Sequence, residues 1–90
     1  MTTLPPDVHQ TLTQLLDSAG EALERGEFET ARESVETAAA VTENKVPPGE
    51  TKARLQHGYR ELEPLLADEP VVAGEYLRLL SETVENCPVG

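Results

Sequence analysis

The stretch Gly26-Glu27-Phe28-Glu29-Thr30-Ala31 lies between two runs in which apolar residues recur at helical spacing. A glycine adopts the positive φ that ends a helix and reverses the chain at little cost. The alanine after the bend, followed by Val35 and Ala38, gives the next helix an inner face of small residues, which lets two helices pack closely. The stretch therefore predicts the bend of an antiparallel helical hairpin.

The helix before this bend is predicted over residues 5–25, and the helix after it over residues 27–43. The first carries one apolar face at the spacing of an amphipathic helix, made of Val8, Leu12, Leu15, Leu16, Ala19 and Leu23. The second has an inner face made of Phe28, Ala31, Val35, Ala38, Ala39 and either Val41 or Thr42. Gly26 is expected to end the first helix.

The second half of the chain predicts another pair of helices after a loop over residues 44–49, which contains two prolines and a glycine. A helix over residues 50–67 has its apolar face at Leu55, Tyr59, Leu62 and Leu66. Pro64 lies inside this helix and removes a backbone hydrogen bond, and because the apolar spacing continues beyond it we expect a kink.

The last helix is predicted over residues 70–86, with Val72, Tyr76, Leu79, Leu80 and Val84 on its apolar face. Gly74 would cost about 1 kcal/mol relative to alanine inside a helix, so an extended segment over residues 70–74 is the alternative. No segment shows the alternation of a strand. The prediction is an all-α single domain over residues 1–90, in which four antiparallel helices form two hairpins without strands.

The chain is strongly acidic, because 17 acidic residues stand against 7 basic ones and give a net charge of -10. Such a surface repels the phosphates of nucleic acids and anionic lipids, so neither is an expected partner. One explanation is a basic protein partner. The other is a surface of the halophile type, poor in lysine and screened by molar salt. We favour the halophile type, because acidic residues are spread over every predicted helix.

Location and cofactors follow from what the sequence does not contain. No apolar run approaches the ~20 residues that span a bilayer, and the first residues lack the pattern of a signal peptide. The single cysteine, Cys87, has no partner for an internal disulfide. His9 and His57 lack the glutamate three residues earlier that a metal-binding bundle uses. We expect a cytoplasmic protein without a cofactor or metal.

The bend also carries a family resemblance. The pattern Gly26-Glu27-Phe28-x-x-Ala31 followed by Ala38 resembles the turn and second helix of a tetratricopeptide repeat, with Leu15 and Ala19 matching its first helix. The resemblance covers residues 12–43, about one repeat, and implies a helical hairpin that takes part in protein interactions. Three-helix domains of the microtubule-interacting-and-transport type, which bind peptides, are similar at the same bend.

A catalytic function is not expected. HEPN nucleases also resemble the first hairpin, but they need an arginine four to six residues before a histidine, whereas Arg54 and His57 are only three apart. Cys87 has Glu82 and Glu85 nearby, which oppose formation of a thiolate. No nucleophile, base and orienting group come together, so we predict that the chain is not an enzyme.

The predicted function is a small acidic protein-interaction or adaptor module that binds a protein segment in a groove between helices. Glu33 and Glu36 are the candidates for attracting a basic partner, and Tyr59 and Tyr76 for lining the groove. We expect the hydroxyls of these tyrosines to reach the surface. The alternative is a structural protein that forms a homodimer through an apolar stripe on its third or fourth predicted helix.

The high negative charge of the chain predicts that its folding depends on salt. The Debye length grows from ~3 Å at 1 M salt to ~10 Å at 0.1 M, so repulsion among the carboxylates increases on dilution of the salt. We expect the helical circular-dichroism signal, or the midpoint of thermal unfolding, to fall over this range. Equal stability at both concentrations would contradict the interpretation of a halophile-type surface.

Overall fold

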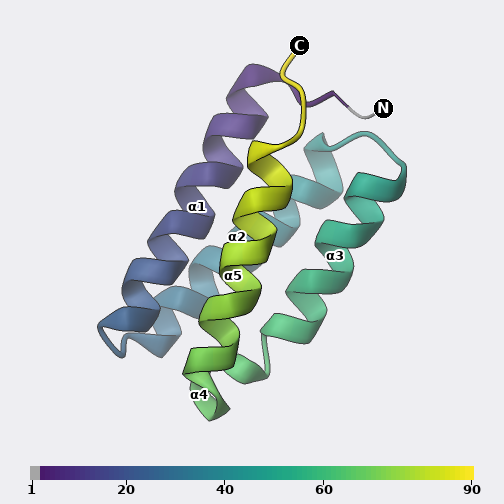
Figure 1. Cartoon of the computed structure of the whole chain (residues 1–90). Helices are drawn as coiled ribbons and strands as arrows, with labels where there is room; N and C mark the ends of the chain where they lie inside the picture. Colours follow the sequence, from purple (N-terminus) through teal and green to yellow (C-terminus); the bar gives the residue numbers. More distant parts are fainter. Residues whose placement is uncertain (1–2) are drawn as a thin grey trace.

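The computed structural model describes residues 3–90, which contain four long helices and one short one (Figure 1). Their bounds are α1 Pro6–Glu24, α2 Phe28–Lys45, α3 Glu50–Leu62, α4 Leu65–Asp68 and α5 Pro70–Glu85. Between residues 3 and 90 the only β pairing is an isolated parallel bridge of Leu4 with Val89, and there is no strand. The predicted all-α fold is confirmed.

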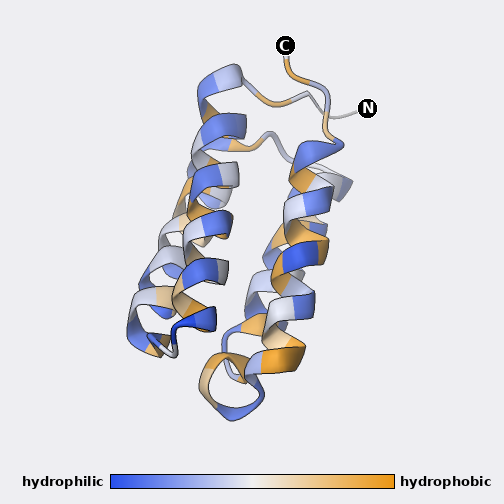
Figure 2. Ribbon diagram, turned by 60° about the vertical axis from the view of Figure 1, so that its left-hand side comes forward, coloured by the Kyte–Doolittle hydropathy of each residue, from blue (hydrophilic) through white to orange (hydrophobic). Residues whose placement is uncertain are grey.

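The four long helices alternate in direction and form a bundle that measures 35 × 20 × 20 Å (Figure 1). Around the bundle, α1 contacts α2, α2 contacts α3, α3 contacts α5, and α5 returns to α1. The most extensive contact is that of α1 with α2. Hydrophobic and polar segments alternate along the ribbons (Figure 2), as expected when each helix turns one face to a shared core.

The bend between α1 and α2 is a helix-terminating motif built on Gly26. The amide of Gly26 donates to the carbonyl of Leu23 at 3.1 Å, and the amide of Glu27 donates to the carbonyl of Ala22 at 2.8 Å. This pair of bonds defines a Schellman motif, which requires a left-handed residue between the helices. Gly26 has φ +74°, so its predicted role is confirmed.

The helix that we predicted over residues 50–67 is instead two helices. α3 ends at Leu62, and a single turn, α4, begins at Leu65. Glu63 and Pro64 keep helical backbone angles, but proline has no N–H to donate, so the hydrogen-bonded ladder is interrupted there. The expected kink is therefore a break between two helices.

One further boundary differs from the prediction, and the predicted start of the last helix is confirmed. α2 continues to Lys45, so the loop predicted over residues 44–49 is reduced to residues 46–49. Residues 70–74 are helical, with Pro70 in the first turn, where its missing N–H costs nothing. The alternative of an extended segment at Gly74 is thus wrong.

One hydrophobic core runs through the bundle, with buried residues from all five helices. Leu4, before α1, is also fully buried. Its amide donates to the carbonyl of Pro88 at 2.9 Å, and its carbonyl accepts from the amide of Gly90 at 3.0 Å. These bonds hold the segment before α1 beside the segment after α5, at one end of the bundle (Figure 1).

Changing the glycines inside helices to alanine is expected to stabilise the bundle at Gly20 and Gly74 and to destabilise it at Gly58. A Cβ at Gly20 would meet nothing within 4 Å, and a Cβ at Gly74 would meet only Leu23 at 3.9 Å. Each change to alanine should therefore raise the free energy of unfolding by roughly 0.5–1 kcal/mol. At Gly58 a Cβ would collide with the buried side chain of Leu80, and overpacking costs typically 1–3 kcal/mol.

We expect Gly74→Ala to raise the midpoint of urea unfolding and Gly58→Ala to lower it. The two variants have the same net charge and the same gain in helix propensity, so they differ only in the space that the methyl group enters. A higher midpoint for Gly58→Ala than for Gly74→Ala would contradict the close packing of α3 on α5.

Candidate protein-binding groove

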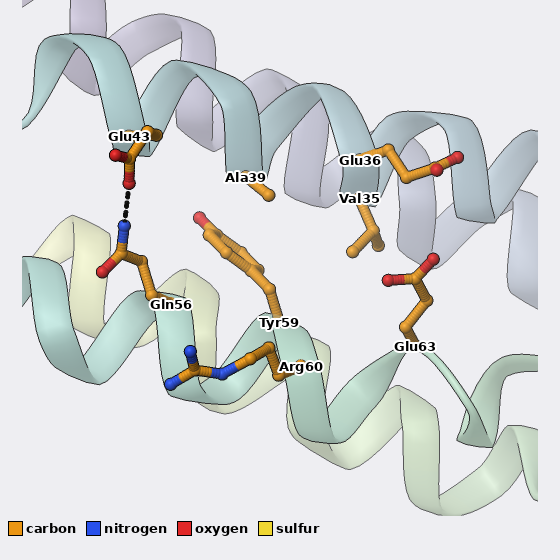
Figure 3. A pocket seen from close by; sticks show the side chains of 8 residues that line it. All are labelled: Val35, Glu36, Ala39, Glu43, Gln56, Tyr59, Arg60 and Glu63. Carbon is orange, nitrogen blue, oxygen red and sulfur yellow. Dashed lines mark hydrogen bonds between the residues drawn. The ribbon is translucent and has the colours of Figure 1, made fainter.

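A groove of about 570 Å³ lies between α2 and α3 (Figure 3). We call it the α2/α3 groove. α2 contributes Val35, Glu36, Ala39 and Glu43, and α3 with the residue after it contributes Gln56, Tyr59, Arg60 and Glu63. The α3 set follows i, i+3, i+4 and i+7, and the α2 set follows i, i+1, i+4 and i+8, so each set lies along one side of its helix.

The apolar floor of the groove is formed by Val35, Ala39 and the ring of Tyr59, which lies between the two helices (Figure 3). Only 3% of Tyr59 is exposed. Its hydroxyl lies 3.1 Å from the hydroxyl oxygen of Thr42. Thr42 gives its own proton to the carbonyl of Ala38 at 2.8 Å, so Tyr59 is the donor in the bond between the helices.

One end of the groove is closed by polar contacts around Glu43. The side-chain amide of Gln56 donates to the carboxylate of Glu43 (Figure 3), and the Nζ of Lys52 donates to its backbone carbonyl at 2.8 Å. Both contacts join α2 to α3, so this end presents a carboxylate whose charge is already partly satisfied.

The opposite end of the groove is open and acidic. Glu36 from α2 and Glu63, just after α3, extend toward the same end (Figure 3). Arg32, which precedes Glu36 by one helical turn, pairs with Glu29 at 3.3 Å rather than with Glu36. Among residues 3–90, no ion pair neutralises Glu36 or Glu63. With Arg60 as the one cation among the lining residues, the groove as a whole is negative.

The structure brings together two of the four residues that the sequence suggested. Glu36 and Tyr59 line the groove, whereas Glu33 is exposed outside it and Tyr76 is half-buried on α5. The expectation that the hydroxyl of Tyr59 reaches the surface is wrong, because Thr42 accepts its hydrogen bond.

Several lining residues were not predicted as part of a site, mainly Ala39, Gln56 and Glu63. The signal was present in the sequence, because Glu36-x-x-Ala39-x-x-x-Glu43 on α2 has the same spacing as Gln56-x-x-Tyr59-x-x-x-Glu63 on α3. Once the two helices are known to be neighbours, these two matching sets of residues face each other. They then predict a groove with polar or acidic residues at both ends.

The described residues show neither a metal-binding cluster nor a membrane-spanning helix. In residues 3–90 no three histidine, cysteine or acidic side chains are grouped so that they could hold a metal ion. The same residues include no helix that is long and apolar enough to cross a membrane.

A comparison with protein-family models finds one match, a domain of unknown function (DUF8101), over residues 1–86. The chain belongs to this family. No curated protein and no solved structure matches the chain. The match spans all the helices of the DUF8101 bundle, including both sides of the α2/α3 groove.

Because of Tyr59, the stability of the DUF8101 domain should depend on pH in the alkaline range. Burial raises the pKa of the Tyr59 phenol above its ordinary value of 10.0. Above about pH 10 the unfolded chain releases this proton while the folded chain retains it, so the free energy of unfolding falls as pH rises.

We expect Tyr59→Phe to lower stability at neutral pH by about 0.5–1.5 kcal/mol, the net value of one hydrogen bond. The same variant should lose less stability than the wild type above pH 10, measured by urea unfolding at several pH values. Thr42→Ser keeps the oxygen that accepts this hydrogen bond. As the control, it should retain the wild-type dependence of the free energy of unfolding on pH. If the free energy of unfolding fell equally with rising pH in the wild type and in Tyr59→Phe, the burial of the phenol would be contradicted.

Proposed function

We propose that this domain is a protein-interaction module whose α2/α3 groove accepts a basic segment of a partner protein. The observation that supports the proposal is an apolar floor bordered by carboxylates from both helices, Glu36 and Glu63, that no cation in residues 3–90 neutralises. An apolar side chain of the partner would cover Tyr59 and Ala39, and a neighbouring lysine or arginine would lie between the two carboxylates.

The role proposed is binding rather than catalysis. The lining residues offer carboxylates, an amide, a phenol and a guanidinium, but no serine, cysteine or histidine. The phenol of Tyr59 already donates its proton to Thr42, so it is engaged in the fold. The resemblance of the α1–α2 hairpin to tetratricopeptide repeats and to microtubule-interacting-and-transport domains favours the same class of function.

The setting proposed is a cytoplasm rich in salt. A net charge of -10 on 90 residues costs little there, because molar salt screens the repulsion between carboxylates. Under these conditions a partner is recognised through contact-range charges and apolar packing, which are the two features that the α2/α3 groove combines.

The second candidate is self-association through α5. Val72, Tyr76 and Leu79 follow one face of that helix, with Val72 41% and Leu79 54% exposed. This stripe lies on the fourth predicted helix, one of the two helices on which the homodimer surface was expected. Each copy carries the same acidic surface, so a dimer would strengthen with salt, and sedimentation at several concentrations in molar salt distinguishes it from a monomeric module.

A peptide-display experiment tests the groove. Peptides selected from a random library on the wild-type domain in molar salt should share an apolar residue flanked by lysine or arginine. Ala39→Leu fills the floor without changing the charge and should weaken binding at least tenfold, by loss of about 1.4 kcal/mol or more. Glu36→Lys should weaken it similarly.

Glu33→Lys is the matched control, because it makes the same charge change on the same helix outside the groove. It should leave affinity nearly unchanged. Circular dichroism checks that each variant is folded. If the selected peptides bind equally to wild type, Ala39→Leu and Glu36→Lys, the α2/α3 groove is not the binding site.

A further inference from the structure

The seam between α1 and α5, which shares neither helix with the α2/α3 groove, is also hollow. Two hollows of about 570 and 390 Å³ share Gly20, Glu24 and Gly74 among their lining residues, so they join into one depression, which we call the α1/α5 trough. The polar and small residues of its α1 wall are Asp17, Gly20, Glu21 and Glu24. Its α5 wall runs from Pro70 to Glu85 and includes Val71, Gly74, Glu75, Arg78, Ser81 and Glu82. From residue 70 to residue 85 this is about 22 Å of helix.

The two glycines in the trough are not required by the bundle. Both lie inside helices, where glycine is less stable than alanine. A Cβ would meet nothing within 4 Å at Gly20 and only ordinary van der Waals contact at Gly74. Gly58 is different, because its missing side chain makes room for Leu80 of this chain. Because Gly20 and Gly74 have no side chains, the surface of the trough is open at these two positions.

The floor of the trough is apolar. Leu16 and Leu77 lie under its longer part and Leu23 under the other, and all three are buried core residues. At the Pro70 end the trough continues onto Val71, which is 82% exposed and is the most exposed large hydrophobic residue among those described. An occupant of the trough would cover Val71 together with the leucines.

The rim of the trough is acidic. Its one cation, Arg78, is occupied by Glu75 at 2.7 Å and Glu82 at 3.1 Å. Within residues 3–90, Asp17, Glu24 and Glu85 take part in no ion pair. The trough therefore combines an apolar floor, two glycines and free carboxylates on both walls, which is complementary to a cationic amphipathic surface.

The geometry favours a helix as the occupant. The backbone groups inside α1 and α5 are already paired within each helix, so the trough offers no edge to an extended peptide. It also lacks the aromatic lining that polyproline ligands use. A second copy of this chain would bring another net charge of -10 against the acidic rim. A helix satisfies its own backbone groups and can approach closely over glycine.

We propose that the α1/α5 trough binds a basic amphipathic helix of a partner protein, independently of the α2/α3 groove. Small residues of that helix pack over Gly20 and Gly74, its apolar face covers Leu23 and Val71, and its lysines or arginines pair with Asp17, Glu24 and Glu85.

The test uses the full chain in about 1 M salt, where diffuse attraction between charges is screened. The probe is a synthetic helical peptide of leucine, lysine and alanine, about 15 residues long to match the trough at 1.5 Å per residue, with alanine at the positions that face the glycines. A scrambled peptide of the same composition, which has no apolar face, is the control. In two-dimensional NMR spectra the probe should shift the amide signals of Gly20 and Gly74, while the scrambled peptide leaves them in place.

Variants separate this proposal from the α2/α3 groove. Gly20→Ala and Gly74→Ala keep the charge and raise helix propensity. Together they should weaken binding of the probe at least fivefold although the domain becomes more stable. Ala39→Leu should leave the affinity for the probe unchanged, and neither glycine variant should affect peptides that depend on Ala39. If the signals of Gly20 and Gly74 do not move at saturating probe, or if only signals of α2 and α3 move, the proposal that the trough binds a helix is wrong. The proposal for the α2/α3 groove would be unaffected.

Discussion

The close pairing of α1 with α2 is the constraint on which the rest of this bundle depends. The Schellman bonds at Gly26 reverse the chain within two residues, and Ala31 and Ala38 on α2 are fully buried. Small side chains at these positions allow the most extensive helix contact in the molecule. With these two helices fixed side by side, α3 and α5 pack on them as a second layer and close the ring of four.

The open seams of the ring arise from residue size. Between α2 and α3 the ring of Tyr59 spans the space between the helices and its hydroxyl ties to Thr42, while Ala39 beside it leaves a hollow. Between α1 and α5 the hollow lies over Gly20 and Gly74. Because the two seams share no helix, one face can be occupied without covering the other.

Much of this fold could be predicted from the sequence, because helical spacing and the glycine at residue 26 are local signals. The break at Pro64 was harder, since Glu63 and Pro64 keep helical angles and the apolar spacing runs on to Leu66. The site could be predicted only in part. Glu36 was predicted from its charge and Tyr59 from its aromatic ring. Ala39 and Gly74 matter because of the space that they leave, and that space depends on which helices are neighbours.

The acidity of the chain constrains how either surface could work. In 1 M salt, where the Debye length is ~3 Å, carboxylates would attract a cation only near contact, so long-range steering would be lost and affinity would come mainly from apolar burial. Glu36 and Glu63, or Asp17 and Glu85, would then select a basic partner at short range rather than draw it in. A fall in affinity on removal of a carboxylate should therefore appear in the dissociation rate, while the association rate stays nearly constant.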